Sequence, residues 1–368
     1  MIPPPTAAAV ATLRLTLTRG VGELIGRRLL DAAGGAEALW RMGPEGWRTI
    51  SGVGDRLVAA LERAAAFDPA PLLARCARAG IGLCAIDDDT YPPQLAACDD
   101  APLLLFYRGN LAALTAPRMV AVVGARRATQ EGIAVTRRWS RFWAEAGAVI
   151  VSGMAPGIDS AAHHGALKAH APSVAVLGFG IAAADTPRRR QIEALCDGGG
   201  CVVSELPPQT RARAHFFPRR NRIIAGLTPA TVVMEAARRS GSLITARRAL
   251  EYGRELFAVP GSVLGEGHRG CHALIREGAA QLLDAPGQLC DALGWSPADC
   301  GPPPTAAPEN ETEEIVCRLL AREPRHIDAL VEESGLTLSC LSPALLALEM
   351  RGVIERLPGN RYALTHPD

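Results

Sequence analysis

The chain has 368 residues and a mass of 38.7 kDa, more than one hydrophobic core of ordinary size holds, so we expect two to four domains. Hydrophobic residues make up 48% of it and charged residues 21%, which excludes a chain disordered throughout. No apolar stretch approaches the roughly 18–20 residues of a membrane helix, and the first ten residues lack the basic segment of a signal peptide. We therefore expect a cytoplasmic protein that does not insert into a membrane.

The first 67 residues predict a small helical domain built around two similar turns. Gly20-Val21-Gly22 and Gly52-Val53-Gly54 each precede a stretch with apolar residues at helical spacing. The pattern resembles tandem helix-hairpin-helix units of the sterile-alpha-motif type, in which turn amides can hold a phosphate. A helical packing module that never touches DNA is an equal alternative, since the segment carries eight arginines against six acids.

Residues 68–295 predict an α/β domain with a mainly parallel sheet. Short apolar runs alternate with helical stretches there, at Met119–Val123, Val149–Ser152, Val174–Leu177, Cys201–Ser204, Thr231–Met234 and Leu256–Val259. Continuous apolar runs indicate strands buried on both faces, hence a parallel sheet with helices on either side. A further run, Leu103–Tyr107, predicts a strand at one edge. Ligands of such sheets bind where strand C-termini lead into helix N-termini.

A proline-rich linker, residues 296–308, separates this domain from a last module, residues 309–368. The module predicts a winged helix of three helices and a hairpin, at Ile315–Leu320, Ile327–Ser334, Leu341–Arg351, Val353–Leu357 and Arg361–Leu364. It holds six arginines against eleven acids, and its expected recognition helix carries one base, Arg351. Protein contact or simple packing is therefore favoured over DNA binding by this module.

The net charge of +1 conceals a basic middle of the chain. Residues 118–225 hold fifteen Arg or Lys against seven Asp or Glu, so this stretch carries +8 and the remainder −7. A basic region between acidic ends is typical of a phosphate or nucleic-acid site. Solvated helix faces are the alternative, which we favour for Arg137, Arg138 and Arg141.

Three turns rich in glycine and serine follow predicted strands. They are Gly124-Ala125-Arg126, Ser152-Gly-Met-Ala-Pro-Gly-Ile-Asp159 and the stretch Glu235–Ala246 around Ser240-Gly241-Ser242. Small side chains allow a ligand to approach closely, and backbone amides can face an anion. Because all three turns belong to one sheet edge, they predict a phosphate pocket.

The segment from Phe216 to Arg222 places two phenylalanines beside clustered arginines, with Arg211 and Arg213 just upstream. Such a pairing suits a single strand, whose phosphates meet guanidinium groups while an exposed base stacks on a ring, worth about 1–3 kcal/mol per base. The alternative is that the rings lie in the core and the arginines cap a helix. We favour that alternative for Phe216 but not for Phe217.

Two patterns could suggest an enzyme. Gly178-Phe-Gly180-Ile-Ala-Ala183 fits a dinucleotide fingerprint, with Glu205 ending the next strand, but Pro187 would break the helix that the fingerprint must open. No nucleotide cofactor is expected on that pattern.

Ser152, Asp159 and His163 could be taken for a catalytic triad, but Asp159 is better explained as a helix N-cap and no nucleophile elbow is present. His268 and His272 flank Cys271 without a second ligand pair, so no metal site is expected.

Together these motifs resemble the DNA-processing protein A family (DprA, also called Smf). The residues that carry the likeness are Asp89–Pro92, Phe106–Asn110, Val123–Arg126, Ser152–Asp159, His163, Gly165–Leu167, Ser204-Glu205, Phe217–Gly226, Ser240–Ala246 and Val259–Gly261. The resemblance implies an extended Rossmann-like domain, flanked by the helical domain and the winged helix. It also implies binding of single-stranded DNA without catalysis or cofactor, homodimerisation, and loading of the RecA recombinase in natural transformation.

The turns and the resemblance together predict DNA contacts at Gly124, Arg126, Arg127, Ser152, Gly153, Arg188, Arg213, Phe217, Arg219, Arg220, Asn221, Arg222, Ser240, Gly241 and Ser242. We expect Arg126, Arg220 and Arg222 to share one groove. The chain departs from the family at residues 178–187, a loop one residue longer and without the family's Tyr, and at His268–His272, where the family's Asn is absent.

The function that follows is that of a non-enzymatic single-strand binder that protects incoming DNA and mediates recombination. The alternative is an enzyme, a nucleoside-monophosphate phosphoribohydrolase of a related Rossmann-like group that carries a P-G-G-x-G-T turn followed by Glu. The corresponding turn here, Ser240–Thr245, lacks that glycine run and the Glu. A pure scaffold is a third possibility.

Overall fold

The computed structural model describes residues 3–295, 310–320, 323–350, 353–357 and 359–364, and they form two compact units that divide after Trp295. The predicted linker, residues 296–308, and Arg351 lie outside the described residues. In the part of the chain that the structure describes, no helix is both long and apolar enough to cross a bilayer.

The first unit begins with five helices, α1 (Ala7–Thr16), α2 (Glu23–Ala33), α3 (Ala36–Arg48), α4 (Asp55–Ala65) and α5 (Ala70–Arg78). Both predicted turns are present, since Gly20 and Gly52 have φ angles of 91° and 84°, which favour glycine, and Gly22 and Gly54 cap α2 and α4. The side chains of α1–α4 form a cluster around Trp47. Leu103 belongs to the same cluster, and Ala9 and Leu13 of α1 pack with sheet residues, so the helices and the sheet form one compact unit. That residues 1–67 are a domain of their own stays a prediction.

A nine-stranded sheet follows, with the order β1-β2-β6-β5-β4-β3-β7-β8-β9. Its strands are β1 (Gly82–Ala85), β2 (Leu104–Gly109), β3 (Met119–Val123), β4 (Val149–Ser152), β5 (Ser173–Val176), β6 (Cys201–Ser204), β7 (Ala230–Val233), β8 (Glu255–Ala258) and β9 (Gln281–Leu282). The strands from β6 to β9 in this order run parallel, whereas β1 and β2 pair antiparallel.

The six predicted buried strands are therefore confirmed to within one residue at each end. The expected edge position of Leu103–Tyr107 is wrong, because β1 pairs with the outer side of β2 and forms the edge itself. β1 was not predicted, although its four residues are all buried and it is no shorter than β4 to β8.

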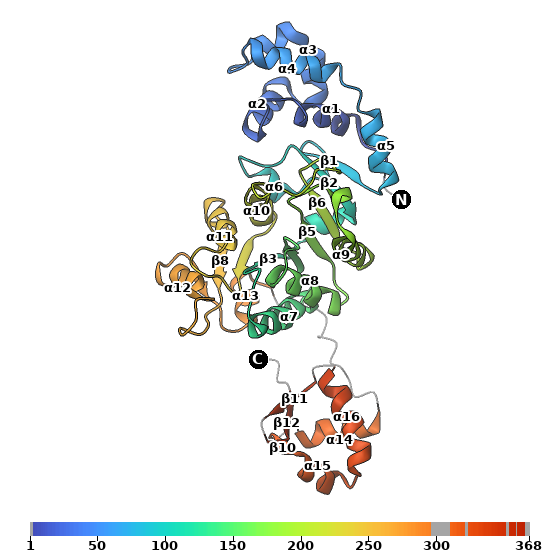
Figure 1. The fold of residues 1–368 in the computed structure, drawn as a ribbon, viewed down its shortest axis with the longest axis vertical. Helices are drawn as coiled ribbons and strands as arrows, with labels where there is room; N and C mark the ends of the chain where they lie inside the picture. The colour runs from blue at the N-terminus through green and yellow to red at the C-terminus, as the bar shows by residue number, and fades with distance from the viewer. Residues whose placement is uncertain (1–2, 296–309, 321–322, 351–352, 358, 365–368) are drawn as a thin grey trace. The chain divides into compact units, whose positions relative to one another are not determined.

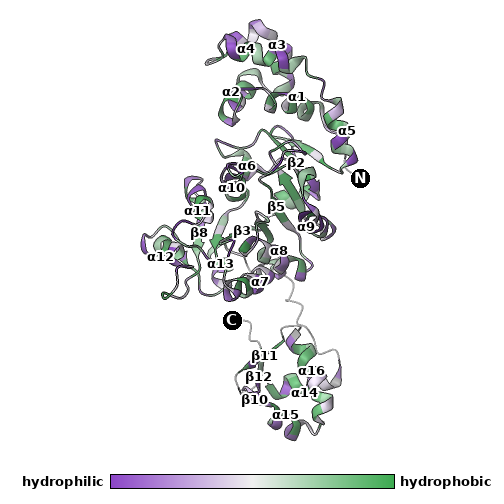
Figure 2. Ribbon diagram, in the orientation of Figure 1, coloured by the Kyte–Doolittle hydropathy of each residue, from purple (hydrophilic) through white to green (hydrophobic). Residues whose placement is uncertain are grey.

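Helices cover both faces of the sheet (Figure 1). They are α6 (Pro93–Ala96), α7 (Gln130–Glu145), α8 (Ile158–Lys168), α9 (Thr186–Asp197), α10 (Phe216–Gly226), α11 (Ser242–Glu251), α12 (Arg269–Arg276) and α13 (Gly287–Ala292). Alternate residues of β3 enter opposite cores, Ala121 with Ile223 of α10 and Val120 with Trp143 of α7. The central strands are accordingly apolar along their length (Figure 2).

The second unit is a winged helix with α14 (Glu311–Leu320), β10 (Arg325–His326), α15 (Ile327–Ser334), α16 (Leu338–Met350), β11 (Ile354–Leu357) and β12 (Arg361–Leu364). Its strands have the order β10-β12-β11. The bounds predicted for α15 and β12 are confirmed, and β10 escaped prediction because it has two residues. Leu330, Leu345 and Tyr362 lie in its core.

Candidate nucleic-acid interface

The three predicted turns meet at one edge of the sheet because the parallel strands that precede them, β4, β3 and β7, are neighbours. The turns also bond to each other directly. Ala125 donates its backbone N–H to the Glu235 carbonyl at 2.7 Å, and Ile158 donates to the Ala125 carbonyl at 3.2 Å. Gly157 has a φ of 84°, and a Cβ there would lie 2.3 Å from the Ala125 oxygen, so only glycine fits this crossing.

Glu235, the second residue after β7, fixes the loop between β3 and α7. Its buried carboxylate accepts hydrogen bonds from the backbone N–H of Thr129 at 3.0 Å and from the Thr129 hydroxyl at 2.8 Å. The same loop carries Arg126 and Arg127, both exposed. Glu235 is missing from the predicted DNA contacts. The sequence did offer a signal for it: Glu235 is an acid that directly follows the predicted buried strand Thr231–Met234, at the edge where ligands bind.

Phe217, in the first turn of α10, lies under the side chain of Arg126. The Arg126 guanidinium carbon is 5.0 Å from the centroid of the ring, a cation–π arrangement. The ring packs closely on Gly178, where a Cβ would come within 2.9 Å of it. Phe217 is half-buried, so the interface joins an aromatic ring to an exposed cation.

Arg220 does not contribute to the surface, contrary to expectation. It is 4% exposed and donates to the Gly153 carbonyl at 2.7 Å and to the Val176 carbonyl. A Cβ on Gly153 would lie 2.4 Å from the Arg220 Nη1, so this glycine makes room for the guanidinium rather than for a phosphate. Ser152 is fully buried as well and donates to the Val122 carbonyl at 2.7 Å.

The buried counter-charge of Arg220 is Asp159, which accepts from the backbone N–H of Ala155 at 3.3 Å. Burial raises the pKa of Asp159, against the opposing pull of Arg220, and burial lowers the pKa of Arg220 to about 10. Asp159 is not the N-cap that the sequence predicted, because Gly157 caps α8 and Asp159 lies in its first turn.

Arg222 is likewise 4% exposed and belongs to a cluster of ion pairs. Its Nη2 lies 2.7 Å from Glu205 and 2.9 Å from Glu23, and its Nε lies 3.7 Å from Asp100. The expected groove shared by Arg126, Arg220 and Arg222 is therefore wrong, since only Arg126 faces solvent. A helical segment rich in arginine does not reveal from its sequence which side chains point inward.

Other predicted residues do gather at the edge. Asn221 donates to the Gly241 carbonyl at 3.3 Å, which links α10 to the turn where the Ser240 and Ser242 hydroxyls lie 2.8 Å apart. Ser242 itself is buried. Arg219 is 48% exposed at its side chain and pairs with Glu23 and Glu205.

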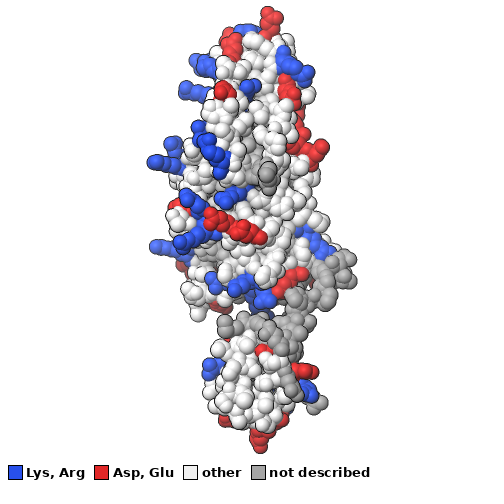
Figure 3. Space-filling view, turned by 90° about the vertical axis from the view of Figure 1, so that its right-hand side faces the viewer, with Lys and Arg blue, Asp and Glu red and all other residues white. Residues whose placement is uncertain are grey.

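Arg188 pairs with Asp185 at 2.8 Å and lies 5.3 Å from the centre of the Phe179 ring. Gly124 is packed, since a Cβ on it would lie 2.6 Å from Ile158. The exposed arginines that follow strand C-termini or lead into α10 are Arg126, Arg127, Arg189, Arg190, Arg211, Arg213, Arg219, Arg238 and Arg239. Arg189, Arg190, Arg211, Arg238 and Arg239 are not among the predicted DNA contacts, although Arg238 and Arg239 stand in a predicted turn. Figure 3 shows Lys and Arg side chains along one margin of the face that it presents, some beside acidic ones.

Neither enzyme-like pattern forms its site. After Gly180 comes a short 3-10 turn, and α9 begins only at Thr186, with Asp185 accepting from the Arg188 N–H at 3.1 Å as its N-cap. The His163 Nδ1 bonds to the Ser173 hydroxyl at 2.8 Å, so the imidazole does not meet Ser152 or Asp159.

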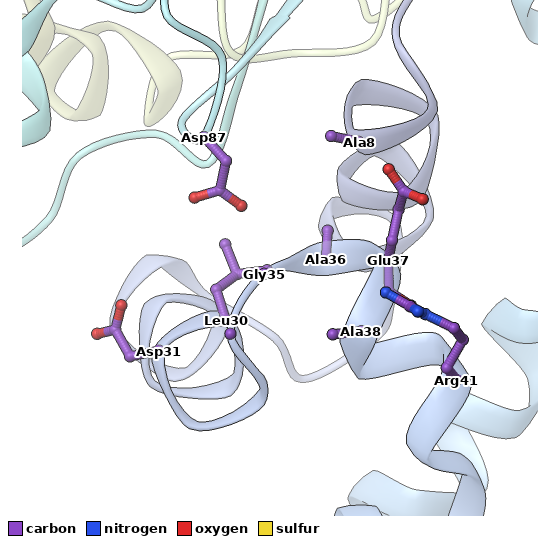
Figure 4. Close-up of a pocket in the computed structure, with 10 residues that line it drawn as sticks. Ala8, Leu30, Asp31, Gly35, Ala36, Glu37, Ala38, Arg41 and Asp87 are labelled. Carbon is purple, nitrogen blue, oxygen red and sulfur yellow. The ribbon is translucent and has the colours of Figure 1, made fainter.

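A cavity of about 470 Å³ lies elsewhere, between the helical region and the loop after β1. Figure 4 shows the carboxylates of Asp31 and Asp87 along it, with Glu37 beside Arg41. Burial raises the pKa of Asp87. This acidic lining does not suit a polyanion, and none of the predicted DNA contacts lines the cavity.

Comparison with known proteins agrees with this architecture. A family model described as DNA recombination-mediator protein A matches residues 82–294, and one described as the DprA winged helix domain matches residues 301–360. The chain belongs to the DNA recombination-mediator protein A family. The protein Smf of Escherichia coli (strain K12) is 40% identical over 298 residues, which cover 76% of either chain.

Two solved members of the family share the fold. The X-ray structure of DprA from Streptococcus pneumoniae superposes with a TM-score of 0.66 at 36% identity, covering 79% of this chain and 98% of that one. The structure of the Helicobacter pylori member, titled for its single-stranded DNA binding mode, has a TM-score of 0.51 at 26% identity and covers 57% of this chain and 95% of that one.

Loss of the Arg220 side chain should destabilise the fold. We expect Arg220→Met to lower the free energy of unfolding by about 3–5 kcal/mol, because it leaves the Asp159 charge buried without its partner. Urea denaturation measures this change. Arg219→Ala on the same helix is the matched control and should cost less than about 1 kcal/mol, since Arg219 is half-exposed. Equal stability of Arg220→Met and the parent protein would contradict the assignment.

His163 should make the fold sensitive to mild acid. Burial, reinforced by Arg220, lowers its pKa from 6.5 to about 3. The unfolded chain therefore binds a proton that the folded chain does not, and the free energy of unfolding should fall as the pH drops below 6.5, by about 2 kcal/mol between pH 7 and pH 5. His163→Asn, which keeps a donor for Ser173, should flatten this dependence in urea titrations. An unchanged slope in the variant would exclude His163 as its source.

Proposed function

We propose that this chain binds single-stranded DNA at the C-terminal edge of its sheet and mediates recombination without catalytic chemistry of its own. The observation that carries the proposal is the juxtaposition of exposed Arg126 with the half-buried ring of Phe217, among the exposed arginines of neighbouring turns. Guanidinium groups neutralise phosphates, and a ring accepts an unpaired base, so the pair recognises a single strand without reading its sequence. The single-stranded DNA binding mode named for the Helicobacter pylori member supports the same assignment.

In the cell, this activity would serve the protection of incoming DNA and the loading of RecA in natural transformation, with the chain acting as a cytoplasmic homodimer. Family membership supports this part of the proposal. The winged helix, with six arginines against eleven acids, would contact protein rather than DNA. DNA contacts would come from the exposed members of the predicted set, whereas Ser152, Arg220 and Arg222 would hold them in place.

Binding should depend steeply on salt. If about six phosphates are neutralised, the logarithm of the affinity for a dT oligomer should fall against the logarithm of salt concentration with a slope near −4. Fluorescence anisotropy over a salt series measures it. Binding that ignores salt, or release of adenine from AMP by the same preparation, would favour the phosphoribohydrolase alternative.

Arg126→Ala should remove one phosphate contact. We expect about tenfold weaker binding, the worth of one charge-assisted hydrogen bond of about 1.5 kcal/mol, and a salt slope about 0.7 smaller in magnitude. Arg138→Ala, an exposed position on α7 away from the turns, is the matched control and should change neither quantity. An Arg126→Ala protein with parental affinity would remove Arg126 from the interface.

Phe217→Leu should weaken binding by a different route. The change keeps an apolar side chain against Gly178 but removes the stacking face, so affinity should fall by about 1 kcal/mol, roughly fivefold. Because no phosphate contact is lost, the salt slope should stay at the parental value. A loss of slope in this variant, or no loss of affinity, would show that the ring does not receive a base.

A further inference from the structure

The first residue of α2, Glu23, reaches across to α10. Its carboxylate accepts from Arg219 and, at 2.9 Å, from Arg222, partners that lie 196 and 199 residues away in the sequence. The position of α2 is closely defined, because a Cβ on Gly26 would lie 2.1 Å from the Leu103 side chain, against which the helix packs. Helix α2 thus places the Glu23 carboxylate against α10, the helix that carries Phe217 and Arg219.

This carboxylate changes the charge of the interface. Three acids, Glu23, Glu205 and Asp100, surround Arg219 and Arg222, so these two arginines bring no surplus positive charge to α10. Burial alone would raise the pKa of Glu23, but Arg222 and Arg219 together hold it below its ordinary value. Glu23 is therefore ionised at neutral pH.

Two ion pairs of the cluster differ in how far their side chains are exposed to solvent. The Arg222 and Glu205 side chains are 5% and 7% exposed and lie 2.7 Å apart, a pair that stays closed to solvent. The Arg219 side chain is 48% exposed and the Glu23 side chain 21% exposed, and they form the outer pair. A phosphate that approaches Arg219 from solvent competes with the Glu23 carboxylate for the Arg219 guanidinium.

We propose that Glu23 is an affinity-determining residue of the DNA interface, whose carboxylate holds Arg219 in free protein and gives it up to a DNA phosphate. The inference rests on the proposed function and assigns the first Gly-x-Gly turn a part in it. The turn reaches the interface through the Glu23 side chain. The helical region then sets how much of the charge of α10 is available to DNA.

Removal of the Glu23 charge tests this inference on the full-length chain with a fluorescent dT oligomer. Glu23→Gln should bind severalfold more tightly than the parent at low salt, with a salt slope steeper by about 0.7, the contribution of one more phosphate contact. Glu23→Asp, which keeps the charge on a shorter side chain, should give a smaller gain. A purely structural contact would instead lower the melting temperature without tightening the binding.

The second turn offers a matched control. Asp55 takes the place after Gly54 that Glu23 takes after Gly22, but its side chain is 94% exposed and pairs with Arg48 at 3.6 Å. Asp55→Asn should leave affinity and slope at parental values. If it tightens binding as much as Glu23→Gln does, the effect is one of net charge and the inference is wrong.

A double-mutant cycle with Arg219→Gln identifies the freed partner. In that background Glu23→Gln should bring no gain, because the arginine that would meet the phosphate is absent. A gain that persists there, or a Glu23→Gln protein that melts like the parent and binds no more tightly, overturns the inference while the proposed function stands. A parent protein that shows no salt-dependent binding overturns the proposed function, and the inference with it.

Discussion

The interface depends on one buried guanidinium. Arg220 joins α10 to the ends of β4 and β5 through the carbonyls of Gly153 and Val176, with Asp159 as its counter-charge. A buried charge is costly unless it is paired and hydrogen-bonded, and the Nη1 of Arg220 meets two carbonyls although its Nε has no partner. These two bonds tie α10 to the sheet. The half-buried Phe217 and the exposed Arg219, both on α10, take their positions from that constraint.

Glycines and acids around this guanidinium serve packing rather than ligand binding. Gly153 leaves space for Arg220, Gly157 for the Ala125 carbonyl, and Gly178 for the Phe217 ring. Glu235 fixes the loop between β3 and α7 by accepting hydrogen bonds from the backbone and the hydroxyl of Thr129. The parts of the edge that meet solvent include nine arginine side chains, Arg126, Arg127, Arg189, Arg190, Arg211, Arg213, Arg219, Arg238 and Arg239, which agrees with recognition of a phosphate backbone.

The sequence predicts the architecture well because strands buried on both faces leave an unmistakable apolar run, as Met119–Val123 does. It predicts the site less well because burial is decided by partners far along the chain. The sequence does not show that Arg222 is buried, because its partner Glu23 lies 199 residues away. It does not show that Arg220 is buried either, because its counter-charge Asp159 comes from a different helix, α8. The edge strand β1 was missed although it lies in an apolar run, Ile81–Ile86, of the same kind as the predicted strands.

The stacking of Arg126 on Phe217 has a consequence for the unloaded protein. The Arg126 guanidinium lies over the ring, so under the proposed function a nucleobase that stacks on that face would compete with the guanidinium. Binding would then be an exchange, in which the arginine leaves the ring for a phosphate as the base arrives. In the free protein, the guanidinium covers an aromatic face that would otherwise meet solvent.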